Sequence, residues 1–445
     1  MKKTIIGLFL FLFMVSCRGR QATPVAVPGI TPTAVAIPSA STVPPASPSG
    51  FPVMPVPVGM VYSKLPPNYD TPVQWWVMTE NGPHLVMYRD NWDPPAVPVV
   101  SHDHSLAVFS DGQNVWLINL PTDEKRKLTN LSKNEYGYDP VWSPDDQYII
   151  YGITTTNNTK FDLWRLNVQS GENLDLTGGQ DRLQQALDLA WQPNGILFSS
   201  WKKSDERGNC LRLPWLSISR LTQVRLDGSN YKILDPNTVT FNRPSVSPDG
   251  NSIAYDFGHI YSGGQITIVN PKDFGLKFSD TVALMSPSWS PAGTELSWVI
   301  ADSNNPMNSF NVAVFDLVNK SAKVITQFEP YRGELGACQT SLPDAEYTFW
   351  SPDGKWLAVS SLGFDESKYN LDGGWRRTWI RIFNKNGEVL TTIDEAYQPF
   401  WSPDGKWLAF DRFDKQGLPT IQVIDTGTWK VWQLDVPANS TITDW

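Results

Sequence analysis

Two nearly identical decapeptides lie 51 positions apart in this chain, WSPDGKWLAV at 350–359 and WSPDGKWLAF at 401–410. Ser-Pro-Asp-Gly predicts a tight turn, because proline presets one backbone angle and glycine adopts the left-handed conformation that closes a hairpin. The flanking segments are therefore expected to be antiparallel strands. Along the second strand, Trp407 and Ala409 point to one face and Leu408 to the other, so both faces are apolar. Such a strand must be covered on both sides, which a single hairpin cannot do.

The turn-and-strand unit occurs seven times, which predicts what covers each strand. The copies lie at 98–109, 140–151, 189–198, 244–255, 287–298, 348–359 and 399–410. Further alternating apolar runs follow each copy, so every unit holds four short strands. Four-stranded units repeated in this way predict an all-β fold, a β-propeller whose antiparallel blades pack face to face. Helical spacing is nearly absent, and only residues 181–190 suggest a helical turn.

The two ends of the chain bear on the number of blades. Residues 72–90 add two strands before the first copy, and the final Thr-Asp-Trp resembles the strand that precedes each turn. If the C-terminal strand pairs with Gln74–Met78, the two ends complete one more blade and close the ring. We therefore favour eight blades, with seven as the alternative, and place the propeller at residues 61–445.

The motif Pro-x-Trp-Ser-Pro-Asp-Gly resembles the WD40-like (PD40) repeat of the TolB-like β-propeller family. The resemblance covers about residues 98–435. It is specific for the repeat but implies little about function, because unrelated proteins carry the same repeat. The first copy departs most, with His102 and His104 in place of proline and glycine. TolB also has a separate N-terminal domain where this chain has a Pro-rich segment, so the role of TolB is not implied.

The N-terminus resembles that of an exported bacterial lipoprotein. Lys2 and Lys3 precede a short apolar run, which is typical of a signal peptide over residues 1–16. Cys17 matches the lipidated cysteine of a lipobox, although Met14 stands where leucine is usual; an ordinary signal peptide is the alternative. Residues 17–60 are rich in Pro, Ala and Thr, which favours an extended tether. These features predict a propeller held on the extracytoplasmic side of a bacterial membrane by a lipid anchor.

The charge of the chain argues against one class of partner. Its 36 basic and 45 acidic residues give a net charge of −9, and removing Lys2 and Lys3 with the signal peptide makes it −11. No basic stripe occurs, so a nucleic-acid partner is not expected. The sequence favours an envelope protein, a peptide or a glycan as the partner, and a monomer as the state of the chain.

Propeller topology divides the connections between two faces. The Ser-Pro-Asp-Gly turns share one face, while the long connections near 200–216, 257–264, 301–310, 328–346 and 361–377 share the other. Binding residues often lie on such connections. Three tryptophans that fit no repeat position and four neighbouring residues form a candidate aromatic and cationic rim there: Trp201, Trp215, Tyr331, Arg332, Trp375, Arg376 and Arg377. The alternative is that these aromatic residues only pack their own connections.

Cys210 and Cys338 belong to this same face, so a disulfide between them is topologically allowed in an exported protein; two free thiols are the alternative. His102 and His104 form a lone pair in a turn, and we expect neither a metal nor a cofactor. The aspartates of the turns, Asp249, Asp353 and Asp404, resemble catalytic acids only in isolation, since they repeat with the turn.

Two classes of function remain open. A binding module requires a ligand-contacting loop face. A propeller hydrolase or lyase, of the lactonase or glycan lyase kind, requires acidic or histidine residues that converge at the propeller axis. The prolyl oligopeptidase type is disfavoured, because the chain has no Gly-x-Ser-x-Gly nucleophile motif and no room for a hydrolase domain. We favour the binding module and predict no catalytic residue.

Overall fold

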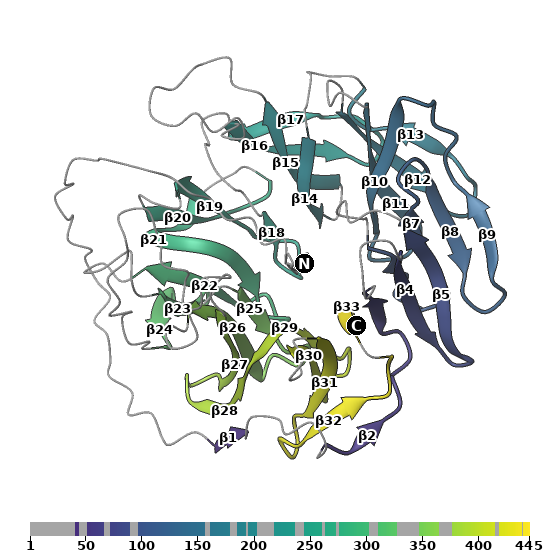
Figure 1. Ribbon diagram of the computed structural model, residues 1–445. Coiled ribbons are helices and arrows are strands. Elements are labelled where there is room, and N and C mark those ends of the chain that lie inside the picture. The colour runs from purple at the N-terminus through teal and green to yellow at the C-terminus, as the bar shows by residue number, and fades with distance from the viewer. Residues whose placement is uncertain are drawn as a thin grey trace, which may run out of the picture.

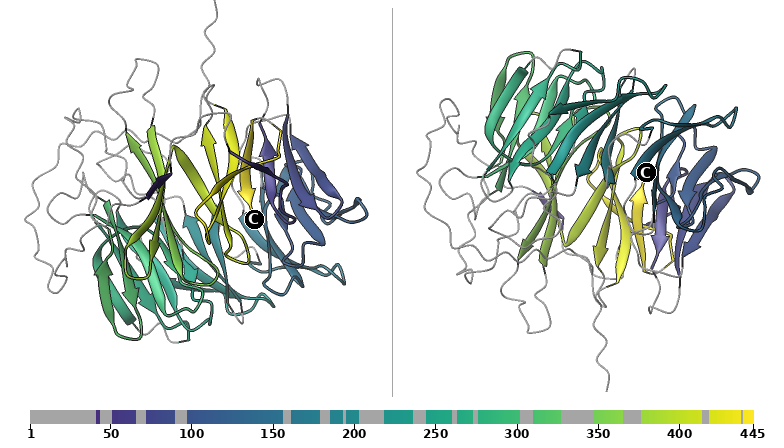
Figure 2. Two further views of the ribbon diagram at one scale, coloured as in Figure 1. Left: turned by 90° about the horizontal axis from the view of Figure 1, so that it is seen from below. Right: turned by 90° about the horizontal axis from the view of Figure 1, so that it is seen from above.

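The chain folds into a ring of eight four-stranded antiparallel blades, an eight-bladed β-propeller (Figures 1 and 2). The computed structural model describes residues 41–43, 51–65, 72–89, 97–155, 161–178, 185–192, 195–202, 218–235, 244–259, 263–272, 276–301, 310–326, 347–364, 376–413, 418–437 and 439–445. The predicted fold class is confirmed. The favoured number of blades, eight, is also confirmed, and the alternative of seven is not. No helix in the described part of the chain is long and apolar enough to cross a membrane.

The blades are numbered from the first sequence repeat, and the first strand of each lies nearest the axis. Blade one contains β6 (Val99–Val100), β7 (Leu106–Ser110), β8 (Val115–Asn119) and β9 (Glu124–Lys127). Blade two contains β10 (Glu135–Trp142), β11 (Tyr148–Thr155), β12 (Phe161–Asn167) and β13 (Asn173–Asp175). Blade three contains β14 (Gln185–Gln192), β15 (Gly195–Lys202), β16 (Ile218–Arg225) and β17 (Lys232–Asp235). Part of the segment in which a helical turn was suggested therefore belongs to the strand β14, and that suggestion is wrong.

Blades four and five share one long strand. Blade four contains β18 (Ser245–Val246), β19 (Ile253–His259), β20 (Gly263–Val269) and the first part of β21 (Leu276–Trp289). Blade five contains the rest of β21, β22 (Glu295–Ala301), β23 (Phe310–Asp316) and β24 (Ser321–Val324). The first part of β21 pairs with β20 and its last part pairs with β22, so the chain passes between blades without a loop.

The remaining blades complete the ring. Blade six contains β25 (Tyr347–Trp350), β26 (Trp356–Phe364), β27 (Arg376–Asn384) and β28 (Val389–Asp394). Blade seven contains β29 (Ala396–Trp401), β30 (Trp407–Phe413), β31 (Pro419–Asp425) and β32 (Val431–Leu434). Blade eight contains β33 (Ser440–Asp444), β3 (Val61–Lys64), β4 (Val73–Thr79) and β5 (Gly82–Arg89).

Blade eight joins the two ends of the chain, as the sequence predicts, but through a different strand pair. The C-terminal strand β33 pairs with β3, and β3 in turn pairs with β4. The expected pairing of the C-terminal strand with Gln74–Met78 is therefore wrong. The four residues of β3 form a strand too short to show an alternating pattern, and they directly follow a Pro-rich segment.

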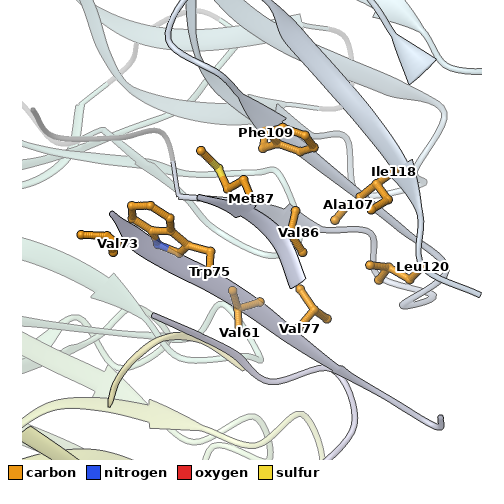
Figure 3. Packing of buried hydrophobic residues seen from close by; sticks show 10 residues of the cluster. All are labelled: Val61, Val73, Trp75, Val77, Val86, Met87, Ala107, Phe109, Ile118 and Leu120. Atoms are coloured by element: carbon orange, nitrogen blue, oxygen red, sulfur yellow. The ribbon is translucent and has the colours of Figure 1, made fainter. Parts of the chain in front are cut away.

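Each of the eight boundaries between blades contains one cluster of buried apolar side chains. Figure 3 shows the cluster between blades eight and one, which contains Trp75 and Val77 of β4 and Phe109 of β7. On β30, Leu408 packs toward blade six, whereas Ala409 packs toward blade eight. The two apolar faces of the repeated strand are thus covered by the two neighbouring blades.

At four of the boundaries, the tryptophan of the motif joins a blade to the one before it. The Trp401 indole N–H donates to the carbonyl of Phe349 at 3.0 Å, and the Trp350 indole donates to Ser288 at 3.2 Å. Trp142 and Trp289 make the same kind of bond across their own boundaries. A buried indole N–H needs an acceptor, and the carbonyl of the preceding blade supplies it. The repeated tryptophan thus contributes both apolar area and a hydrogen bond at these boundaries.

The N-terminal segment 51–60 runs from the outer rim into the boundary between blades seven and eight. β2 (Val53–Met54) pairs in parallel with β32, and β1 (Ser41–Val43) pairs in parallel with β28. Met60 is fully buried between blades seven and eight. The outer strand β32 reads Val-Trp-Gln-Leu and lacks charge, whereas β9 reads Glu-Lys-Arg-Lys and is exposed. An uncharged edge strand can accept another strand, and a charged edge discourages pairing. Residues 51–60 fall within the segment expected to be tether, and here they are part of the folded body.

The positive φ of the turn glycine Gly405 predicts how its substitution changes the stability of the protein. Gly405 has φ of 68°, and a Cβ atom added there would meet its nearest neighbour, Asp353 Cγ, at an ordinary 3.7 Å. The strain in Gly405→Ala therefore comes from the backbone, and we expect it to lower the free energy of unfolding by about 1–2 kcal/mol. Gly405→Asn should lose less, because Asn tolerates this conformation and Asp146 adopts it in blade two at φ of 54°. Equal losses in denaturant titrations of the two variants would contradict this explanation.

Candidate binding face

The two faces of the ring differ in the length of their connections. One face, here called the turn face, carries the connections between first and second strands and between third and fourth strands. These span two to six residues. The strand ends that bound the other connections, including 203–217, 325–346 and 365–375, lie on the opposite face, here called the loop face. The longest connections between strands therefore all begin and end at strand ends on the loop face.

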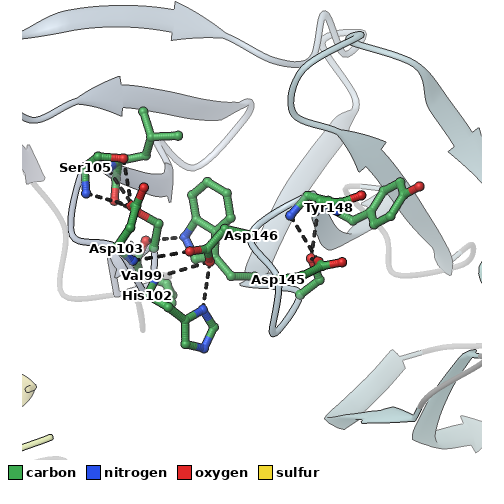
Figure 4. A network of polar contacts seen from close by, with 12 residues as sticks. Val99, His102, Asp103, Ser105, Asp145, Asp146 and Tyr148 are labelled. Carbon is green, nitrogen blue, oxygen red and sulfur yellow. Dashed lines mark hydrogen bonds and ion pairs between the residues drawn. The ribbon is translucent and has the colours of Figure 1, made fainter.

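The turn face is built from one repeated hydrogen-bond network. In blade six, the Ser351 hydroxyl donates to Asp353 at 2.7 Å and accepts the backbone N–H of Trp356 at 2.9 Å. The same network occurs in blades two, four and seven, and with Asp103 in blade one (Figure 4). In blade seven, the Lys406 side chain, backbone amide bonds and Ser402 lower the pKa of Asp404 to about 2. The turn aspartates thus stabilise their own turns by accepting hydrogen bonds within them.

The turns also contact one another around the ring. Asp146 occupies the glycine position of its turn, and its carboxylate accepts the backbone N–H of His102 at 3.1 Å and approaches the His102 ring nitrogen Nδ1 at 2.7 Å (Figure 4). His104 occupies the same position in blade one, and its ring lies against Gly59 of the neighbouring blade. Within the described part of the chain, no group of three His, Cys, Asp or Glu residues is placed to hold a metal ion. The two histidines therefore join neighbouring turns.

The structure places three of the seven predicted rim residues by their backbone. Trp201 is the last residue but one of β15, and Arg376 and Arg377 begin β27. All three positions lie at strand ends on the loop face, on blades three and six. Their side chains are not among those described. The remaining predicted residues lie outside the described residues: Cys17, Trp215, Tyr331, Arg332 and Trp375, and both cysteines of the predicted disulfide, Cys210 and Cys338.

Two aromatic pairs near the loop face were missed by the sequence analysis. Tyr397 and Phe413 of blade seven stack with ring centroids 4.9 Å apart, and both rings are half-buried. Tyr138 and Phe161 of blade two form a tilted pair at 5.3 Å. Both tyrosines stand two residues before the motif proline, in Tyr-Asp-Pro and Tyr-Gln-Pro. That repeated tyrosine is the signal that could have revealed them, since half-buried aromatic residues are frequent anchors in binding sites.

Two buried ionisable residues lie next to each other on β30. The Arg412 side chain donates to the carbonyl of Asp394 at 2.7 Å and to the side chain of Gln422 at 3.1 Å, and burial lowers its pKa. Asp411 is fully buried and accepts hydrogen bonds from the hydroxyl of Thr441 and the backbone N–H of Ile442. Burial raises the pKa of Asp411 to about 8, against the effect of these two bonds. Asp411 thus joins blade seven to the C-terminal strand.

No family model matches the chain. Among solved structures, it is similar to a prolyl endopeptidase, with a TM-score of 0.53 and 14% identity over 78% of this chain and 49% of that chain. The chain thus spans about half the length of that enzyme. It is also similar to the dihydro-heme d1 dehydrogenase NirN, with a TM-score of 0.52 and 13% identity over 92% of this chain and 78% of that chain. TolB from Acinetobacter baumannii matches with a TM-score of 0.35 and 11% identity, over 74% of this chain and 76% of that chain. Likeness at these identities shows the propeller fold alone.

Proposed function

We propose that this protein is a lipid-anchored extracytoplasmic β-propeller whose loop face binds a protein, a peptide or a glycan at the cell envelope. The observation that carries this proposal is the difference between the two faces. Short turns joined by hydrogen bonds occupy the turn face, while connections of up to 22 residues extend from strand ends on the loop face. A rigid scaffold with long connections on one side is the usual arrangement of a binding module.

The way in which the N-terminal segment joins the ring supports the proposed anchoring. Within residues 51–60, β2 lies at the outer rim, where it pairs with the outermost strand of blade seven. An anchor that precedes β2 would therefore attach to the propeller at its rim. A monomer held in this way keeps its loop face available to a partner.

Affinity capture from solubilised envelopes tests the proposal, with two variants that each remove two positive charges. Arg376→Ala/Arg377→Ala changes the loop face, at the start of β27. Lys355→Ala/Lys406→Ala changes the turn face, where both lysines are exposed and pair only with the aspartate of their own turn in the described structure. We expect the arginine variant to lose the captured ligand at least about tenfold, which corresponds to 1.4 kcal/mol, and the lysine variant to retain it.

Equal retention by both variants would contradict the assignment of the loop face. Loss of the ligand in the lysine variant alone would assign binding to the turn face instead. Chemical turnover of the captured ligand would transfer the assignment to the alternative function, a propeller hydrolase or lyase.

A further inference from the structure

The boundaries of blade eight contain titratable groups. At the boundary with blade seven, the fully buried carboxyl group of Asp411 holds Thr441 and Ile442 of β33. At the boundary with blade one, His84 Nε2 lies 3.2 Å from Asp123 Oδ1. The histidine pair with Asp146 lies one boundary further on. Three of the four histidines of the chain are therefore gathered at or next to the blade that closes the ring.

Four boundaries elsewhere in the ring contain a hydrogen bond from an indole N–H group, which does not titrate near neutral pH. Indole N–H groups donate to carbonyls between blades one and two, four and five, five and six, and six and seven. In blade one, Ser110 occupies the position that corresponds to Asp411, and its hydroxyl donates to the carbonyl of Gly137 in the next blade. A serine at this position thus also joins two blades, but it donates to a carbonyl, whereas Asp411 accepts a hydroxyl and a backbone N–H and can carry a charge.

The surroundings of Asp411 offer hydrogen bonds of a neutral kind. From β33, the partners are the hydroxyl of Thr441 and the backbone amide of Ile442. From β29, the neighbouring titratable group is Tyr397, whose pKa is raised by burial and by Asp411. The adjacent Arg412 directs its guanidinium to Asp394 and Gln422. Both partners donate to Asp411, whether its carboxyl group is neutral or ionised, and these two bonds alone would lower its pKa. Burial outweighs them, because the described contacts of Asp411 include no cation, and an ionised carboxyl group there would be a buried charge, which is strongly unfavourable.

Histidine–carboxylate contacts lie on the other side of the closing blade. His84 faces Asp123, and Lys125 of the same blade donates to Val86 next to it. His102 faces Asp146, and Asp444 of β33 lies close enough for both His102 and His104 to lower its pKa, although burial raises it overall.

We propose that ring closure is proton-dependent: the C-terminal strand β33 is held to blade seven by the protonated carboxyl group of Asp411, and it detaches locally as this group ionises. The propeller is then tightly closed in mildly acidic surroundings and opens at one defined boundary as the pH rises. The boundary between blades five and six remains closed, because the indole N–H of Trp350 that joins these blades does not titrate in this range.

Hydrogen exchange of the full chain, measured from pH 5 to pH 9 and corrected for the intrinsic rate at each pH, tests this proposal. A carboxyl group with a pKa of about 8 when closed and about 3.9 when open favours opening by about tenfold per pH unit, and the effect levels off above pH 8. The amide of Ile442 should follow this profile. The amides of β25, between blades five and six, serve as the internal control and should show no such slope.

Two variants sharpen the test. Asp411→Asn keeps the shape of the protonated acid, and Asp411→Ser copies the arrangement of Ser110 in blade one. Both should remove the slope at Ile442 while leaving β25 unchanged. A flat profile at Ile442 in the unmodified protein would overturn the proposal, as would an equal slope at β25, which would mean that the whole ring loosens. A slope that persists in Asp411→Asn would also overturn it. The first two outcomes need no variant, so the test holds even if a variant fails to fold.

Discussion

Deleting residues 440–445 is expected to abolish the closed ring, with a loss of more than about 5 kcal/mol in the free energy of unfolding. The deletion removes β33, the inner strand of blade eight, together with the buried side chain of Ile442. It also removes both hydrogen-bond partners of Asp411 and exposes the edge of β3. Chemical denaturation followed by circular dichroism measures the loss directly.

A matched deletion at the other end of the chain provides the control. Removing residues 1–49 leaves every strand of the eight blades in place and removes only β1 from the rim. This variant should unfold at nearly the same denaturant concentration as the intact chain. If the two deletions have similar effects, the C-terminal strand does not close the ring in the way described.

Replacing the motif tryptophan of blade seven should produce the second large effect. Trp401 is 9% exposed and packs between blades six and seven, so Trp401→Ala should lower the free energy of unfolding by about 3–5 kcal/mol. Trp401→Phe keeps most of the apolar contact and loses the N–H bond to Phe349, so its loss should be about 1 kcal/mol. Denaturant titrations of the two variants separate the packing of the ring from the hydrogen bond.

Trp116 offers a control for the hydrogen bond. Its indole N–H donates to Asp111 at 2.7 Å in an exposed position, where water can replace the lost partner. Trp116→Phe should therefore have a smaller effect than Trp401→Phe. A larger loss in the Trp116 variant would show that the bonds between blades do not determine the stability of the ring.

The repeated motif predicted most of the fold, because each copy determines both a tight turn and the strand that follows it. Gly405 and its equivalents specify the turn, and Leu408 and Ala409 specify a strand covered on both faces. The eighth blade could also be inferred, since the final Trp445 matches the motif. The short strand β3 and the rim strand β2 could not be recognised, because the pairing of two to four residues depends on an edge supplied by distant parts of the chain.

The candidate site was less accessible to sequence reasoning. The lengths of the connections between strands predicted which face carries the long ones. Strand order is sufficient to place Arg376 and Arg377 on that face. The role of Asp411 could not be predicted, because its burial depends on the meeting of two segments 30 residues apart. The histidines of the first repeat stood out only as a departure from the motif, and their contacts with Gly59 and Asp146 arise from the closed ring.

Hydrogen exchange with and without the ligand captured from envelopes tests the central claim, that the loop face is the binding face. We predict slower exchange at the loop-face ends of strands, at Trp201–Lys202 of β15 and Arg376–Arg377 of β27, with unchanged exchange in the turns at 351–355 and 402–406. Slower exchange in these turns with no change at the ends of β15 and β27 would contradict the account and assign binding to the opposite face.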